Sequence, residues 1–267
     1  MKILTIILFL VFSVNAQNID IPISLHGYSS KPEFRLVGNV NAVITTSYRN
    51  GILLGDIIVE RFDSKQRKAE KMSVDIGKTV ESENIVNLSY KQYFTYNETS
   101  EKLIEIRSFT SEGIPTTKVK LIYDSRGILK EKFVYSNKGE LTDKDEYSLD
   151  AERKEVTIIS TDYYDDRVLT DKYTLQYNDK NQWIKRTTYN KDDTIKNSVT
   201  FEYDKQGLLA KKINCCEYNF YHTYEYKFDK KGNWIEQIET YYQENEARKW
   251  IGLESMRTYR TITYNNE

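Results

Sequence analysis

Aromatic and polar residues alternate along much of the chain, most clearly in YEYKFDKKGNW (224–234). Here Tyr224, Tyr226 and Phe228 alternate with Glu225 and Lys227. A period of two places the aromatic side chains on one face of a β-strand and the charged side chains on the other. This stretch therefore predicts a strand with one buried and one solvated face.

A turn is predicted directly after that strand. Asp229 can accept hydrogen bonds from backbone N–H groups inside the turn, and Gly232 can adopt the positive φ required by a type I turn with a bulge. YDSRG (123–127) and YDKQG (203–207) preserve both roles, and YNDKN (177–181) replaces the glycine with Asn, another residue that tolerates this conformation. Turns without a glycine are expected after Tyr96 and Leu149, but their type is not predicted.

The same step recurs about every 26 residues along the chain, which indicates an internal repeat. It lies at Tyr96, Tyr123, Leu149, Tyr177, Tyr203 and Phe228, each followed by Asp or Asn. A second turn inside each unit, such as YSNKG (135–139) or YNKDD (189–193), divides the unit into two strands. We therefore predict an all-β protein that forms an antiparallel meander of repeated hairpins.

A flat sheet of this size would leave one aromatic face in water. Because open sheets rarely exceed about ten strands without curling or splitting, we predict a strongly curled sheet or partial barrel. Lys and Glu side chains are expected to pair across strands on its outer face. The side chains expected to point inward are Trp183, Tyr203, Leu209, Tyr226, Phe228 and Trp234.

The chain divides into four predicted segments. Residues 1–16 form a signal peptide, 17–31 an N-terminal leader, 32–89 one or more divergent first β units, and 90–267 the hairpin repeat array. Within the array, the polar stretch 240–255 could hold a short helix, and residues 256–267 are expected to supply the closing strand.

The motifs YDSRG, YDKQG and FDKKGNW resemble the YD repeats of RHS-type proteins, over roughly residues 90–242. The chain is also similar to small secreted proteins of Bacteroidetes that carry such repeats and have no assigned biochemical role. The resemblance implies a β-repeat architecture and implies no particular activity.

The predicted signal peptide MKILTIILFLVFSVNA has Lys2 before an apolar run and small residues before Gln17. It predicts export to the periplasm or the extracellular space. Since Gln17 stands where a lipoprotein needs Cys, a lipid anchor is not expected. An outer-membrane barrel is disfavoured, because turns about every 13 residues should leave strands shorter than the 9–11 residues that span a bilayer.

Composition narrows the classes of partner. Lys and Arg (39) nearly balance Asp and Glu (40), for a net charge of −1. No long-range field of one sign is therefore available to attract nucleic acid or an acidic membrane surface. The 22 Tyr and only 3 Pro suit a pleated sheet.

Candidate chemistry is sparse. Cys215, Cys216 and His222 lie close together in CCEYNFYH and could form a soft-metal site or a thiol nucleophile with a base. Adjacent cysteines do not match the usual metal-ligand spacing, so structural residues or a vicinal disulfide are the favoured reading. The acid pairs Asp165–Asp166 and Asp192–Asp193 lie in predicted turns, where Asp forms local hydrogen bonds. No catalytic residues, confident metal site or cofactor are predicted.

These observations favour an exported, non-enzymatic β-repeat scaffold or binding protein that contacts an envelope or extracellular protein or glycan. The main alternative is a carbohydrate-binding or carbohydrate-acting protein that uses a Tyr/Trp-lined surface, with Trp183, Tyr203, Tyr226 and Trp234 as candidates. A metal or redox role for Cys215, Cys216 and His222 comes third.

Overall fold

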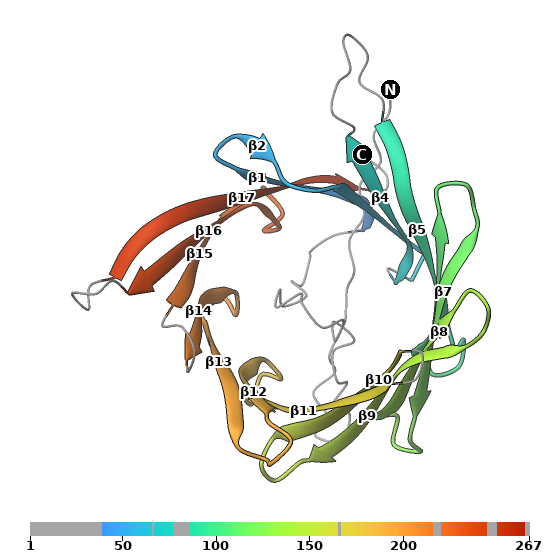
Figure 1. The fold of residues 1–267 in the computed structure, drawn as a ribbon. Helices are drawn as coiled ribbons and strands as arrows, with labels where there is room; N and C mark the ends of the chain where they lie inside the picture. Colours follow the sequence, from blue (N-terminus) through green and yellow to red (C-terminus); the bar gives the residue numbers. More distant parts are fainter. Residues whose placement is uncertain are drawn as a thin grey trace.

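The computed structural model describes residues 39–65, 67–76, 86–164, 167–215, 220–244 and 250–264. These residues form one 17-stranded sheet in which every pairing is antiparallel, so the predicted all-β meander is confirmed (Figure 1). The strands are β1 Val40–Arg49, β2 Ile52–Leu53, β3 Ile57–Phe62, β4 Lys68–Ile76, β5 Val86–Tyr96, β6 Leu103–Thr110, β7 Pro115–Tyr123, β8 Leu129–Ser136, β9 Leu141–Asp150, β10 Glu155–Tyr164, β11 Arg167–Tyr177, β12 Trp183–Tyr189, β13 Ile195–Tyr203, β14 Leu209–Cys215, β15 Phe220–Phe228, β16 Trp234–Glu244 and β17 Trp250–Tyr264.

The sheet closes on itself between its first and last strands. β1 pairs with β3 on one side and with β17 on the other, from Val40 opposite Tyr264 to Arg49 opposite Met256. The two-residue strand β2 pairs only with the end of β1, so the other 16 strands complete a barrel (Figure 1). Closure gives nearly every strand two hydrogen-bonded neighbours, which removes the exposed edges of an open sheet.

The repeated Asp turns gather at one end of this barrel, here called the motif rim, because each repeat unit contains two strands. In one of them, Asp124 Oδ1 accepts hydrogen bonds from the backbone N–H groups of Arg126 and Ile128, both at 2.9 Å. The Ile128 N–H is the main reason that the pKa of Asp124 is lowered. Gly127 follows with φ of 79°, as predicted for a type I turn with a bulge.

The turns that lack glycine differ in a simple way. Asn181 takes the glycine position with φ of 57°, as the sequence predicts. Glu101 and Lys154 carry the positive φ, 55° and 49°, one position later in their turns. These two turns are therefore one residue longer, so Leu103 and Val156 lie six residues after the turn Asn or Asp, whereas Trp183 lies five residues after Asn178.

Strand register places the motif aromatic residues on one face of the sheet. Tyr203 pairs with Leu209, Tyr177 with Trp183 and Phe228 with Trp234, each beside a bulge. Most of the buried hydrophobic residues belong to this face, including Leu209 (1% exposed) and Trp234 (2%). In a closed barrel the less accessible face is the inner wall. The six residues predicted to point inward share it, although Phe228, at the rim, is 40% exposed.

Tyrosine hydroxyl groups join consecutive strands near the motif rim. Each donates a hydrogen bond to the carbonyl oxygen of the first residue in the preceding strand. The four pairs are Tyr96 to Lys68 (3.0 Å), Tyr123 to Leu103 (2.8 Å), Tyr203 to Trp183 (2.8 Å) and Tyr226 to Leu209 (3.0 Å). The repeated tyrosine therefore contributes both apolar packing and a polar contact to the barrel wall.

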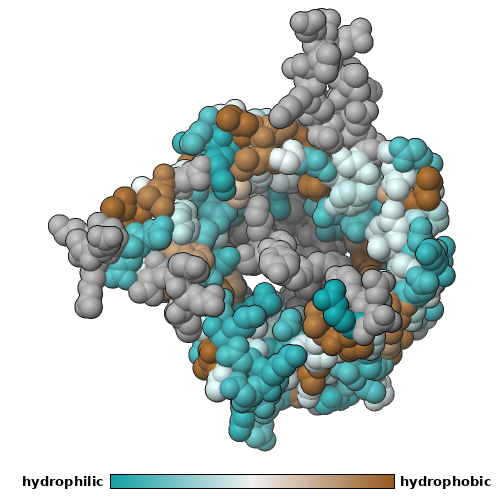
Figure 2. Space-filling model, viewed as in Figure 1, coloured by the Kyte–Doolittle hydropathy of each residue, from teal (hydrophilic) through white to brown (hydrophobic). Residues whose placement is uncertain are grey.

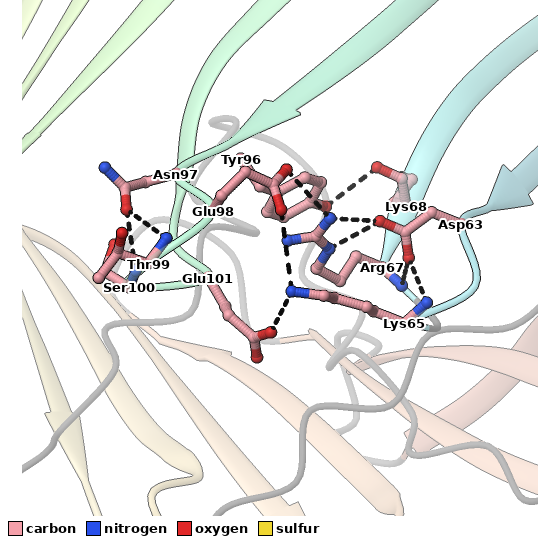
Figure 3. A network of polar contacts seen from close by, with 10 residues as sticks. All are labelled: Asp63, Lys65, Arg67, Lys68, Tyr96, Asn97, Glu98, Thr99, Ser100 and Glu101. Carbon is pink, nitrogen blue, oxygen red and sulfur yellow. Dashed lines mark hydrogen bonds and ion pairs between the residues drawn. The ribbon is translucent and has the colours of Figure 1, made fainter.

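Neighbouring turns of the motif rim also contact one another (Figure 3). Lys65 Nζ lies 2.7 Å from Glu101 Oε1, so the β3–β4 turn is paired with the β5–β6 turn. Arg67 binds Asp63 within its own turn and lies over the ring of Tyr96 at 4.6 Å. Partial burial opposes ionisation of Asp63, but hydrogen bonds from Arg67 and its charge lower the pKa of this carboxyl. These contacts align one repeat with the next.

The outer face is polar, as predicted. Cross-strand ion pairs lie at Lys227–Glu236 (2.6 Å), Arg61–Glu70 (2.9 Å) and Lys144–Glu131 (3.4 Å). Lysine side chains also lie over outer aromatic rings, as Lys118 and Lys120 do at Tyr135. The charged groups occur in the middle of strands as well as at their ends.

One expectation about the strands is wrong, and another is tested only in part. A short helix was expected within 240–255, where residues 240–244 end β16, residues 250–255 begin β17, and residues 245–249 lie outside the described residues. No described residue lies in a helix. The strands are also longer than predicted, since β5, β11 and β16 each contain 11 residues. Tight turns leave most of each half-unit to the strand, so strand length does not argue against a membrane barrel.

Removing the hydroxyl group in Tyr203→Phe should lower the free energy of unfolding by about 1 kcal/mol, because the Trp183 carbonyl loses a hydrogen bond. Chemical denaturation measures this change. Tyr135→Phe is the matched control, since that outer ring packs against lysines and its hydroxyl makes no hydrogen bond within the described residues. Equal losses in the two variants would contradict the assigned role of Tyr203.

Gly207 and Gly232 have the same φ of 85°, so a comparison of substitutions at these two positions separates the effect of backbone strain from that of steric crowding. An added Cβ at Gly232 meets nothing within 4 Å, whereas one at Gly207 would lie 3.1 Å from Gln182 Nε2. Gly232→Ala should therefore cost about 1–2 kcal/mol from the left-handed backbone alone. Gly207→Ala should cost more in the same denaturation assay, because Gln182 also loses its hydrogen bond to the Gly207 carbonyl.

Candidate functional site

The aromatic candidates from the sequence lie in the inner wall. Trp234 is 2% exposed and lies under the guanidinium group of Arg260, at 3.6 Å from the ring centre. Burial lowers the pKa of Arg260 to about 10. Trp183 packs edge-to-face on Tyr177 at 6.2 Å, and the hydroxyl groups of Tyr203 and Tyr226 bind backbone carbonyls. All four residues thus contribute to the packing or hydrogen bonding of the wall.

The Cys/His candidate is described only in part. Cys215 is the last residue of β14, Cys216 lies outside the described residues, and His222 belongs to β15. The proposed thiol chemistry of these residues stays a prediction. Within the described ranges, no cluster of three or more His, Cys, Asp and Glu side chains is arranged to hold a metal ion.

His222 has a carboxylate neighbour that sequence reasoning missed. Its Nδ1 atom lies 2.9 Å from Glu239 Oε1, and the same oxygen accepts a hydrogen bond of 2.9 Å from the Tyr224 hydroxyl. The rings of Phe220 and Tyr241 flank the imidazole at 5.6 and 5.2 Å. Glu239 is opposite Tyr224 on β16, so only the strand register could have identified it.

A cluster of carboxylates lies on the inner wall toward the opposite end from the motif rim. This acidic patch comprises Asp143, Asp145, Asp162 and Asp171. Asp145 is 3% exposed and binds Lys132 Nζ (2.6 Å), the Ser160 hydroxyl (2.6 Å) and the Tyr147 hydroxyl (3.2 Å). Its charge is therefore compensated by a cation and two hydroxyl donors.

Asp143 and Asp162 are directly opposite each other on β9 and β10. Burial, a hydrogen bond with Asp143 and the charges of the other three patch carboxylates raise the pKa of Asp162. Two adjacent carboxyl groups that share a proton can act as an acid and a base. The most buried member of the patch, Asp145, is already bound to Lys132, Ser160 and Tyr147, so the patch indicates no particular reaction.

The acidic patch was not anticipated from the sequence, which directed attention to consecutive aspartates. Asp165 and Asp166 lie outside the described residues. Asp192 lies in the β12–β13 turn and binds the hydroxyl of Thr194 at 2.6 Å, and Asp193 there has φ of 62°, consistent with their interpretation as turn formers. Aligning β9 and β10 about their intervening turn would have brought Asp143 opposite Asp162.

The end of β17 forms an open strand edge. β1 pairs with β17 only as far as Met256, whereas β17 continues back to Trp250 paired with β16 alone. Among the described residues, the 250–255 edge therefore has no strand partner on its β1 side. Figure 1 shows this end of β16 and β17 projecting beyond the neighbouring strands.

Apolar side chains are exposed on the projecting end. Trp250 is 45% exposed, Ile251 45% and Leu253 55%. Tyr221 stacks on Tyr242 at 4.6 Å and contacts Trp250 edge-on at 4.7 Å. Figure 2 shows apolar surface over this part of the molecule. We call Trp250–Ser255 the β17 edge.

A pocket of about 390 Å³ lies where β1 ends beside β17. It is lined by Tyr48, Asn50, Gly51, Ser255, Arg257 and Tyr259. Tyr48 and Tyr259 pack edge-to-face at 5.8 Å, and Arg257 is paired with Glu236 at 2.7 Å. The pocket thus combines aromatic and polar groups next to the β17 edge.

The sequence matches no protein-family profile and no curated protein. Across the described residues, no helix is long and apolar enough to cross a bilayer.

Three solved structures are similar to this chain. A porin-like protein from Bacteroides uniformis ATCC 8492 is 8% identical, with a TM-score of 0.42, over 85% of this chain and 99% of the other. TcdB2-TccC3 is 15% identical, with a TM-score of 0.27, over 73% of this chain and 12% of the other. A protein of unknown function from Bacteroides fragilis NCTC 9343 is 12% identical, with a TM-score of 0.19, over 61% and 89%. Similarities this low assign no function to the chain.

Replacing one member of the carboxyl pair tests its electrostatic cost. The raised pKa of Asp162 means that the folded state binds this proton more tightly than the unfolded state does. Protonation of the pair therefore stabilises the folded state as the pH falls through the folded pKa of Asp162. This contribution is absent at neutral pH. Asp162→Asn should raise the Tm at pH 7 by about 2–4 °C for each kcal/mol of repulsion removed, and by less at pH 4.

The matched control for this measurement is Glu152→Gln, which removes one negative charge from an exposed turn. It should leave the Tm nearly unchanged at both pH values. A lower Tm for Asp162→Asn at pH 7 would show that Asp162 is stabilising as a carboxylate.

Proposed function

We propose that this protein is an exported, non-enzymatic β-repeat binding protein of the cell envelope or extracellular space, and that its β17 edge captures an extended polypeptide segment of a partner. The observation that carries the proposal is the 250–255 edge, which has no strand partner on its β1 side among the described residues and exposes Trp250, Ile251 and Leu253. Export rests on the predicted signal peptide at residues 1–16.

Strand addition is the binding mode that suits such an edge. An open edge presents backbone N–H and C=O groups that an incoming strand can pair with, and neighbouring side-chain pockets add specificity. Exposed apolar edges are an aggregation hazard that soluble proteins normally cover or charge. The partner segment would pair with the stretch of β17 that extends past its pairing with β1.

The outer face supports a barrel surrounded by water. A membrane barrel presents an apolar band to lipid, and Arg or Lys at its midplane costs about 2–4 kcal/mol. The outer wall of this barrel instead carries charged residues in the middle of strands, such as Lys118 and Lys120 of β7 and Lys144 of β9, which is paired with Glu131. We therefore favour a barrel that does not span the membrane, as the sequence predicted on other grounds.

A relationship to YD-repeat proteins is part of the same proposal. The Asp turns, the positive-φ glycine and the tyrosine hydroxyl bonds all recur at the motif positions. The repeats would then serve as a scaffold, and binding would be a property of the rim opposite the motif turns.

Carbohydrate binding is the second candidate, and the pocket beside the β17 edge favours it. Tyr48 and Tyr259 could contact sugar rings, and Arg257, Asn50 and Ser255 could bind hydroxyl groups. The first candidate takes precedence because Ile251 and Leu253 are aliphatic, and aliphatic side chains suit a polypeptide better than a sugar.

The test is selection of displayed random dodecapeptides on the purified chain, followed by hydrogen exchange of the complex. Selected peptides should protect the backbone amides of residues 250–255. The double variant Ile251→Lys, Leu253→Lys should weaken binding at least tenfold, because lysines block strand addition. Ile122→Lys is the matched control, since Ile122 is an exposed apolar residue on the outer face of β7.

Three outcomes would count against strand addition. Peptides that bind both variants equally would place their site elsewhere, and failure to enrich any peptide would remove the support for a polypeptide ligand. If an oligosaccharide from a test panel binds the chain and this binding is lost in Tyr259→Ala, the pocket would be the binding site and the second candidate function would be supported.

A further inference from the structure

A group of donors on the inner wall of β12, β14 and β15 has no role in the function proposed above. Arg186 and Asn214 lie at the same level of the sheet, each paired with Val199 of β13 between them. Their backbones are therefore two strand spacings, about 10 Å, apart. Lys212 lies two residues from Asn214 on the same face, opposite His222 of β15. We call Arg186, Lys212, Asn214 and His222 the donor group.

Two members of this group hold buried donors without acceptors. Asn214 is 9% exposed, and its Nδ2 atom is buried and makes no hydrogen bond within the described part of the chain. Arg186 Nε is likewise buried and has no hydrogen-bond partner among these residues, while its guanidinium group lies 4.6 Å from the centre of the Tyr173 ring. A buried donor left unsatisfied destabilises the folded state, and more so when it is charged. Both donors would gain from an acceptor placed between them.

The local charge also favours an anion. Burial lowers the pKa of Lys212, and the charge of Arg186 lowers it further while Glu239 opposes this. Two cations that disfavour each other therefore face the same region. Glu239 is a carboxylate beside this group, and one of its oxygens is already shared by Tyr224 and His222. The acidic patch lies on β9 to β11, where Lys132 binds Asp145.

The ligand must supply the hydrogen-bond acceptors that Arg186 and Asn214 lack within the described residues. Arg presents several N–H groups in a planar fork that matches the paired oxygens of a carboxylate, phosphate or sulfate, and Lys and Asn add further donors. Chloride offers no pair of oxygens. Stacking on Tyr173 fixes the plane of the Arg186 guanidinium, so less side-chain freedom is lost on binding.

We propose that the inner wall binds a small oxyanion between Arg186 and Asn214, with Lys212 completing the site and His222 at its border. The shared chemistry is a carboxylate or phosphate group, either free or carried by a larger molecule. This site is independent of the β17 edge, because the donor group lies on β12, β14 and β15.

The experiment is isothermal titration of the purified full chain with inorganic phosphate, sulfate, acetate and chloride at constant ionic strength. Phosphate, sulfate or acetate should bind saturably with one site per chain, and chloride should not compete. At a concentration 100 times Kd, a bound oxyanion stabilises the folded state by about 2.7 kcal/mol, so the Tm should rise in parallel. No saturable heat with any of the oxyanions would overturn the proposal.

Two variants locate the site. Arg186→Gln should lower the affinity at least tenfold, and Asn214→Leu should lower it severalfold while relieving the unsatisfied amide. Lys185→Gln is the matched control, because it removes one positive charge from the adjacent residue, whose place in β12 faces outward. Equal loss in Lys185→Gln and Arg186→Gln would indicate nonspecific attraction and overturn the proposal.

A second measurement covers the possibility that Arg186→Gln does not fold. In the unmodified chain, the NMR resonance of the Arg186 Nε–H group should shift on addition of the bound oxyanion and remain unchanged with chloride. An unchanged resonance in the presence of saturating oxyanion would place the anion elsewhere.

Discussion

Hydrogen bonding of an Asp or Asn side chain inside each motif turn is the constraint on which the barrel depends. The carboxylate of Asp204, for example, accepts from two backbone N–H groups and fixes where one strand ends and the next begins. Since side chains alternate between faces, a slip of one residue would move the inner-wall aromatic residues of the slipped strand to the outer face. The turns thus determine register, and register determines which side chains form the wall.

Closure completes what the turns begin. A sheet with this many strands cannot stay flat, and its accumulated twist brings the first and last strands together. The seam between β1 and β17 also has a side-chain contact, because the Ser47 and Thr258 hydroxyl oxygens lie 3.0 Å apart. The end of β17 is fastened to the repeat array as well, because the Tyr264 hydroxyl lies 2.6 Å from both Asp229 and Asn233 of a motif turn.

The fold was largely predictable, and the polar sites were not. Alternation, turn residues and their spacing predicted the meander, the inward aromatic residues and the curvature, because these follow from local chemistry. Asp143 with Asp162, His222 with Glu239, and Arg186 with Asn214 are brought together by pairing between strands. That pairing between strands cannot be deduced from the sequence, because neither composition nor spacing distinguishes these residues from other polar positions. Within 240–255, where a short helix was expected because polar residues at an outer strand end resemble a solvated helix, the described residues 240–244 and 250–255 are strand.

The placement of all motif turns at one rim has a consequence for how such a protein can change in size. A whole unit contributes two strands and returns the chain to the rim where it started. Duplication or loss of one unit would therefore alter the circumference of the barrel while every remaining strand kept its direction and its inward face. Gain or loss of a single strand would reverse the direction of all later strands and prevent antiparallel closure with β1. The diameter of such a barrel thus changes in steps of one hairpin. The number of strands stays even, because each repeat unit adds or removes two.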